Sequence, residues 1–167
     1  MNRHYDRYLV KKYEPLYQNR YADMRSTAMC WGFEVGDGWF QIIHHLSYVL
    51  CSDWLQAKSA YELMKKREGS TLFGGQEKHG NLVITGRMVE EARLTMENAY
   101  KDVPIASQVK EKYGTLRFYL ENGTNEHYAA VSMAEAMSSV TCDVCGNKGR
   151  RSHYGWIVTR CKEHEDD

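Results

Sequence analysis

Four side chains of the kinds that bind metal ions are paired near the C-terminal end of this sequence. Cys142 and Cys145 form a C-x2-C pair, and fifteen residues further on Cys161 and His164 form a C-x2-H pair. Three thiolates and one imidazole are donors that fill the tetrahedral shell of Zn²⁺ in structural sites. Because four protein ligands leave no position for a reactive water, the pattern predicts one structural zinc ion rather than a catalytic one.

Oxidation of the first cysteine pair to a disulfide is the competing interpretation, since a spacing of two residues also suits a redox bridge. In a reducing cytosol, two spaced pairs that include a histidine favour metal binding instead. His153 is a reserve ligand in case His164 is displaced together with the acidic C-terminal tail. The remaining cysteines lie beside apolar residues and are predicted to be buried thiols: Cys30 and Cys51.

The stretch between and beside the predicted zinc ligands is basic. Residues 147–162 contain several Lys and Arg residues and no Asp or Glu. The bases are Lys148, Arg150, Arg151, Arg160 and Lys162. They predict either a surface that binds nucleic-acid phosphates or a solvated face that offsets the charge of three thiolates. The whole chain has 22 Lys and Arg against 22 Asp and Glu. This balance argues against a generally basic nucleic-acid binder but leaves a local basic contact open.

A second group of polar residues lies around a glycine-rich turn and is the best candidate for catalysis. An acid–histidine cluster of Glu34, Asp37 and His44 would suit a metal-dependent enzyme such as a nuclease. However, His44 and His45 are adjacent on a predicted helix and point about 100° apart, unlike the i, i+4 pair of a zinc helix. Asp37 can equally cap that helix. No phosphate-binding loop or nucleophile elbow occurs, so we expect a protein without enzymatic activity.

The elements that must position these residues are predicted from hydrophobic periodicity. Apolar residues at helical spacing predict helices near residues 5–17 (interrupted by Pro15), 39–50, 53–67, 87–101 and 126–139. Leu116, Phe118 and Leu120 alternate with polar residues, which predicts a hairpin over residues 105–120. A short strand is possible at residues 82–85. A cap at Thr124 or Asn125 would begin the last helix.

These elements predict an α+β protein in which a mostly helical body, residues 1–140, contains a small antiparallel sheet. Residues 141–167 form a zinc-ribbon or knuckle-like module packed on that body. We expect Trp156, Ile157 and Val158 to make that contact. The glycine-rich segment 69–86 is a candidate contact surface for a partner.

Composition excludes a disordered chain, since 43% of the residues are hydrophobic and 12% are aromatic. No apolar run approaches the roughly 18 residues of a membrane span. The first residues lack the apolar stretch of a secretory signal. We therefore expect a cytoplasmic protein with no membrane partner.

Four segments of the chain resemble blocks of an uncharacterised family of small proteins from tailed phages and prophages. They are residues 24–43, 108–120, 133–138 and 141–164. The resemblance implies a phage origin, zinc binding by the C-terminal cysteines, and a place in the cytoplasm of the infected host. It implies no activity.

The leading hypothesis is therefore a non-enzymatic zinc protein that binds and modulates a host protein of defence, transcription or replication. A nucleic-acid-binding protein that uses the basic zinc module is the first alternative, and a metal-dependent nuclease is the second. The oligomeric state is left open.

Overall fold

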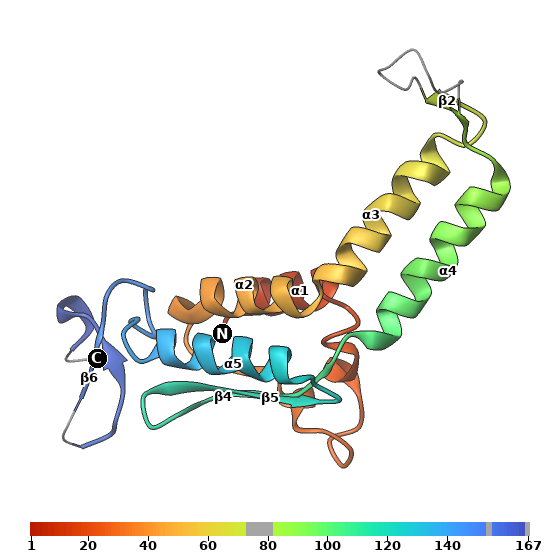
Figure 1. The fold of residues 1–167 in the computed structure, drawn as a ribbon. Coiled ribbons are helices and arrows are strands. Elements are labelled where there is room, and N and C mark those ends of the chain that lie inside the picture. The colour runs from red at the N-terminus through yellow and green to blue at the C-terminus, as the bar shows by residue number, and fades with distance from the viewer. Residues whose placement is uncertain (73–81, 153–154, 166–167) are drawn as a thin grey trace. The chain divides into compact units, whose positions relative to one another are not determined.

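The computed structural model describes residues 1–72, 82–152 and 155–165 of the chain (Figure 1). The chain divides into two compact units. The first contains residues 1–51 and 104–167, and the second contains residues 52–103. All the metal-ligand candidates belong to the first unit.

The first unit is built on a three-stranded sheet in the order β1-β4-β5. Its strands are β1 (Phe33–Glu34), β4 (Ile105–Lys112) and β5 (Thr115–Glu121). Its helices are α1 (Arg3–Lys12), α2 (Phe40–Leu50) and α5 (Asn125–Ser138), with short 3₁₀ helices η1 (Gln18–Tyr21), η2 (Ala28–Trp31), η3 (Asp37–Trp39) and η4 (Lys162–His164). A two-stranded ribbon, β6 (Arg150–Arg151) with β7 (Thr159–Arg160), lies near the C-terminus.

The β4–β5 hairpin is closed by a two-residue turn at Tyr113 and Gly114, whose φ angles are 54° and 75°. Two successive residues with positive φ suit the type I′ turn, whose twist matches that of antiparallel strands. The pairing places Val109 opposite Phe118, and both side chains are buried. β1 joins the other edge of β4 in parallel, with Phe33 opposite Val109. The sheet is therefore mixed, not purely antiparallel as the sequence predicted.

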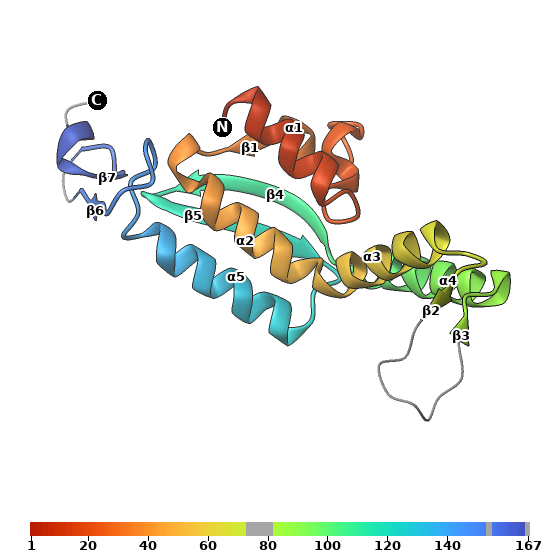
Figure 2. The same cartoon turned by 90° about the horizontal axis from the view of Figure 1, so that it is seen from above.

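Helices α2 and α5 lie side by side over the β4–β5 hairpin (Figure 2). Ile43, Leu46 and Leu50 of α2 are buried, as the helical periodicity predicts, but Val49 is exposed. α5 begins at the capping box of Thr124, whose hydroxyl accepts a hydrogen bond from the His127 backbone N–H. The helix is fixed to β5 because Ser138 Oγ accepts a hydrogen bond from the Leu116 N–H at 2.8 Å.

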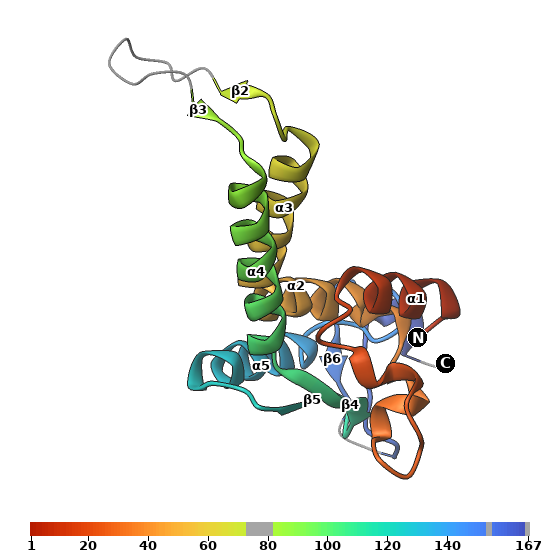
Figure 3. The same ribbon diagram turned by 90° about the vertical axis from the view of Figure 1, so that its right-hand side faces the viewer.

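The second unit is a helical hairpin of α3 (Ser52–Lys66) and α4 (Gly86–Asp102), which lie side by side (Figure 3). Its helices are joined through the short strands β2 (Thr71–Leu72) and β3 (Leu82–Val83). Trp54 is buried and contacts the ring of Tyr100 edge-on. Half of the candidate contact segment 69–86, residues 73–81, lies outside the described residues, so its proposed role stays a prediction.

The α+β class and the predominance of helix are confirmed. Each predicted helix lies within a few residues of an observed one, although Pro15 ends the first helix early, at Lys12. Within the described residues, every helix is too short or too polar to cross a membrane.

Candidate metal centre

The four predicted ligands Cys142, Cys145, Cys161 and His164 lie together. One ligand atom from each lies within 4.8 Å of all the others. No other group of three or more His, Cys, Asp or Glu side chains in the described parts of the chain is placed to hold a metal ion. The sequence spacing therefore identified the one candidate metal centre of these residues.

The spacing of the donor atoms fits a tetrahedral ion. Bonds of about 2.3 Å to a central Zn²⁺ would place two sulfur ligands about 3.8 Å apart. The Sγ atoms of Cys145 and Cys161 are 3.7 Å apart, and Cys142 Sγ is 3.7 Å from His164 Nδ1. Cys161 Sγ lies 3.2 Å from the same nitrogen. All cysteines are free, so the structure gives no support to the disulfide interpretation.

The local backbone brings the first pair of ligands together. The Gly146 N–H donates a hydrogen bond to the Cys142 carbonyl at 3.0 Å, which closes a tight turn. Gly146 has a φ of 80°, as expected for the residue after a C-x2-C pair, because glycine adopts this conformation without a Cβ penalty. The Cys142 N–H donates in turn to the Asn147 carbonyl at 2.8 Å. The knuckle, defined as residues 141–148, is thus held by its own backbone.

The electrostatics of the knuckle favour a thiolate at Cys142. Burial raises the pKa of this thiol, but hydrogen bonds from the backbone of Cys145, Cys161 and Val144 outweigh it and lower the pKa to about 7. A thiol must lose its proton before it binds a metal ion, so these backbone donors prepare the site for a cation.

The knuckle rests on a glycine loop, residues 36–39, that the sequence predicted only as a turn. The Gly38 N–H donates to the Asp143 carbonyl at 2.9 Å, and the buried indole of Trp39 donates to the Thr141 carbonyl at 2.8 Å. A Cβ atom on Gly36 would lie 2.0 Å from the Asp143 carbonyl oxygen. The loop therefore needs glycine because another backbone lies directly against it.

The other side of the metal centre rests on the tip of the β4–β5 hairpin. The Thr159 hydroxyl is fully buried and donates to the Gly114 carbonyl at 2.6 Å. Ile157 and Val158 are half-buried beside the same glycine, as predicted. Trp156 does not make this contact: its side chain is 82% exposed, so that part of the prediction is wrong. Ile157 and Val158 meet the hairpin just before β7 begins, whereas Trp156 lies in a bend beside them and faces solvent.

The five basic residues do not form one free cationic surface. Arg160 is only 20% exposed and forms an ion pair with Asp143 at 3.4 Å. Arg150 is 82% exposed and lies 3.7 Å from the Glu165 carboxylate, an ion pair at the surface. The remaining bases are exposed: Lys148, Arg151 and Lys162. The reserve ligand His153 lies outside the described residues.

Glu34, Asp37 and His44 have separate structural partners. Asp37 accepts two hydrogen bonds of 2.6 Å from Asn2, at the start of α1, instead of capping α2. Glu34 is exposed and lies 3.4 Å from the amide of Gln108. The His44 ring stacks on Phe40 and lies 2.8 Å from the Tyr13 hydroxyl. The geometry therefore offers no support for catalysis by this trio.

His44 should make the protein sensitive to acid. Burial lowers its pKa below the usual value, and the charges of Lys12 and His45 lower it further. At pH values between the pKa of His44 in the folded protein and its pKa in the unfolded chain, the unfolded chain binds more protons. The free energy of unfolding therefore falls as the pH drops below about 6.5. Denaturant unfolding from pH 7 to pH 5 measures this loss, at most about 1.4 kcal/mol per pH unit for one proton.

His44→Gln should flatten the pH dependence of the unfolding free energy, whereas His45→Gln, which removes only the smallest cause of the lowered His44 pKa, should preserve most of it. If the unfolding free energy of His44→Gln depended on pH as steeply as that of the wild type, a group other than His44 would cause the dependence.

The other cysteines differ in burial. Cys51 is buried, and burial raises the pKa of its thiol to about 12, so it stays protonated and unreactive. Cys30 is only half-buried, so the prediction holds for one of the two.

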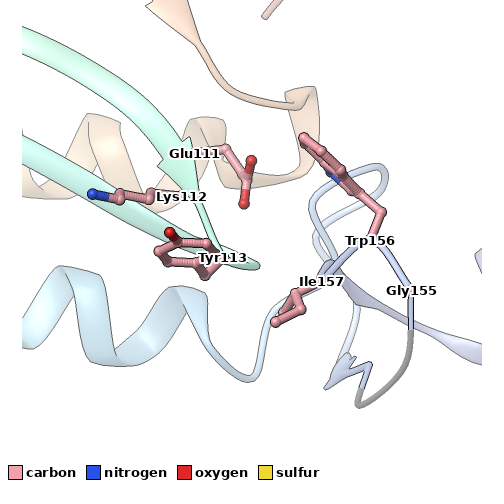
Figure 4. A pocket seen from close by; sticks show the side chains of 6 residues that line it. All are labelled: Glu111, Lys112, Tyr113, Gly155, Trp156 and Ile157. Carbon is pink, nitrogen blue, oxygen red and sulfur yellow. The ribbon is translucent and has the colours of Figure 1, made fainter.

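Two of the hollows on the first unit have mainly apolar or aromatic linings. An apolar groove of about 290 Å³ runs between α2 and α5, and its lining includes Leu46, Val49, Met133 and Met137. Its lining contains no Asp, Glu, Lys or Arg. The second hollow lies beside Trp156 and Tyr113 (Figure 4).

Comparison of the chain with protein-family models, curated proteins and solved structures finds no match.

Proposed function

We propose that this chain is a phage-encoded zinc protein that binds and modulates a host protein without catalysing a reaction. The observation that carries the proposal is the four-donor cluster of three thiols and one imidazole, spaced for a tetrahedral ion. Zn²⁺ is the ion that best suits this donor set. With four protein ligands in place, the ion holds the knuckle as a structural element and has no open position for a substrate.

Binding of a protein partner is supported by apolar side chains exposed on the same unit as the metal centre. Trp156, Tyr113 and Met133 are each at least 60% exposed. Exposed aromatic side chains are enriched in protein interfaces, and apolar grooves without charged residues mark sites of protein association. Host defence, transcription and replication proteins are the candidate targets, and the infected cell's cytoplasm is the proposed location.

Capture of the tagged full-length chain from infected-cell lysate tests this function. We expect one host protein to be recovered repeatedly, in stoichiometric amount and also after nuclease treatment. The Cys142→Ser variant, which lacks a ligand, is the matched control and should recover less of it. Recovery of no host protein above the tag alone would contradict the proposal.

Nucleic-acid binding by the zinc module is the second candidate, and the exposed bases Lys148, Arg151 and Lys162 favour it. If this function is correct, the chain should bind single- or double-stranded DNA or RNA with an affinity that falls steeply as the salt concentration rises. The affinity should also fall in the Arg150→Ala, Arg151→Ala double variant. The ion pairs of Arg150 and Arg160 with nearby carboxylates reduce the charge available for phosphates. We therefore place this function second.

A further inference from the structure

A hollow of about 360 Å³ lies where the tip of the β4–β5 hairpin meets the chain before β7. It is lined by Glu111, Lys112, Tyr113, Gly155, Trp156 and Ile157. Figure 4 shows the rings of Tyr113 and Trp156 on opposite sides, the Glu111 carboxylate directed between them, and Ile157 below. Two aromatic walls, an acid and an aliphatic floor thus share one opening.

Both aromatic rings of the hollow are largely exposed to solvent. Trp156 is 82% exposed and Tyr113 is 60% exposed. Neither ring lies in the core. The backbone beside each ring has a hydrogen bond: the Thr159 hydroxyl donates to the Gly114 carbonyl, and the Ser152 hydroxyl donates to the Trp156 carbonyl at 3.2 Å. Aromatic side chains with only two rotatable χ angles lose little conformational entropy when a ligand binds between them.

The space between Glu111 and Trp156 favours a cation. Glu111 accepts one hydrogen bond from the Gly114 N–H at Oε1, 2.6 Å away, which orients the carboxylate and leaves its second oxygen available. Lys112 points away from Trp156 in Figure 4, and its Nζ lies 5.5 Å from the centre of the Tyr113 ring. The Lys112 ammonium therefore does not occupy the space between Glu111 and Trp156. Aromatic faces attract cations, and a carboxylate repels phosphates.

We propose that this hollow binds an arginine side chain of a partner protein. The guanidinium plane would stack on Trp156 and pair with Glu111, while the aliphatic stem would pack on Ile157. The planar guanidinium suits this geometry better than the compact ammonium of lysine. The inference deepens the proposed function, on which it rests in taking the ligand to be part of a protein.

The test uses the full-length ¹⁵N-labelled protein and a blocked peptide, acetyl-Gly-Arg-Gly-amide, with the same peptide carrying citrulline as the uncharged control. The indole N–H of Trp156, identified by comparison with the Trp156→Phe spectrum, and the Gly114 amide should shift saturably with the arginine peptide. The citrulline peptide should bind about tenfold more weakly. Absence of saturable shifts at these two positions would overturn the inference.

Three variants make the result specific to the hollow. Glu111→Gln keeps an acceptor for the Gly114 N–H and should weaken arginine binding about tenfold. Trp156→Ala should abolish it, and Trp31→Ala, at a tryptophan that is 60% exposed elsewhere on the same unit, should leave it unchanged. Unaltered spectra away from the hollow establish that each variant is folded. Arginine shifts that persist in both hollow variants would overturn the inference, as would competition for the same residues by a deoxythymidine oligonucleotide.

Capture from lysate separates the two proposals. Loss of the host protein in Trp156→Ala, together with peptide binding, supports both. Capture that is unchanged in Trp156→Ala, together with no peptide shift, overturns the arginine site and leaves the binding function standing. Absence of any captured protein contradicts the function whatever the peptide does.

Discussion

Replacing Gly38 by alanine is expected to loosen the metal centre although Gly38 is not a ligand. The new Cβ atom would lie 2.2 Å from the Cys142 carbonyl oxygen and 2.5 Å from the Gly146 nitrogen. Both atoms belong to the backbone of the knuckle, so the clash cannot be relieved by rotating a side chain. The φ of Gly38 lies outside the left-handed region, and alanine brings no torsional strain of its own. The effect is therefore steric.

We expect Gly38→Ala to lower the free energy of unfolding by about 3 kcal/mol, the range of overpacking in a well-packed interior. Displacement of the knuckle should also weaken metal affinity by roughly 10- to 100-fold, as loss of a supporting contact does in other metal sites. Denaturant unfolding and competition with a chromophoric chelator measure the two effects.

Gly86→Ala is the matched control. Gly86 is the first residue of α4, and a Cβ atom there would meet only the mobile end of the Glu68 side chain, at 3.0 Å. Stability should be unchanged or slightly increased, because alanine favours helix. If Gly38→Ala were as stable and as tight a metal binder as Gly86→Ala, the contact between the glycine loop and the knuckle would not support the site.

The Cys142→Ser variant is expected to lose its metal ion and much of the stability of the first unit. Serine is a far weaker ligand than thiolate, and structural zinc contributes on the order of 10 kcal/mol to the folding of small metal-bound modules. Cys142 is completely buried at the centre of the knuckle, so the remaining donors cannot move outward to compensate. We expect a loss of roughly 4 kcal/mol or more, equivalent to a fall in Tm of about 10 °C.

Calorimetry with and without a strong chelator measures this loss. Chelation should lower the Tm of the wild-type protein and leave Cys142→Ser unchanged, because the variant has no ion to lose. Cys51→Ser, at a buried cysteine away from the cluster, should remain sensitive to the chelator. An equal fall in Tm on chelation in Cys142→Ser and in the wild type would contradict a role for this ligand.

Local features of the fold were predictable because short segments determine them. The C-x2-C and C-x2-H spacings identified all four donors, and Gly146 marked the turn between them. The alternation of Leu116 and Phe118 and the glycine after Tyr113 predicted the hairpin and its tight turn.

Features that depend on contacts between distant segments were not predictable from one sequence. Gly38 and Trp39 bind carbonyls of the knuckle about 100 residues later in the chain, and no local pattern identifies that contact. β1 has two residues and exists only because it pairs with β4. The hydrogen-bond partner of His44 is Tyr13, 31 residues away in the sequence. Because the sequence does not reveal this partner, His44 was a candidate for acid or base catalysis.

Three segments that are separate in the sequence meet the metal centre. Residues 24–43 supply the glycine loop, residues 108–120 the hairpin, and residues 133–138 the end of α5 that leads into the knuckle at Thr141. The Thr141 hydroxyl donates to the Met137 carbonyl at 2.8 Å. These three segments each form a hydrogen bond with residues 141–164, so the metal centre and its supports form one structural unit.

The metal content of the full-length protein, purified without added metal and measured by mass spectrometry with plasma ionisation, tests the zinc site most directly. We predict about one zinc ion per chain. Protein that contains no metal, with Cys142 and Cys145 oxidised to a disulfide, would contradict it.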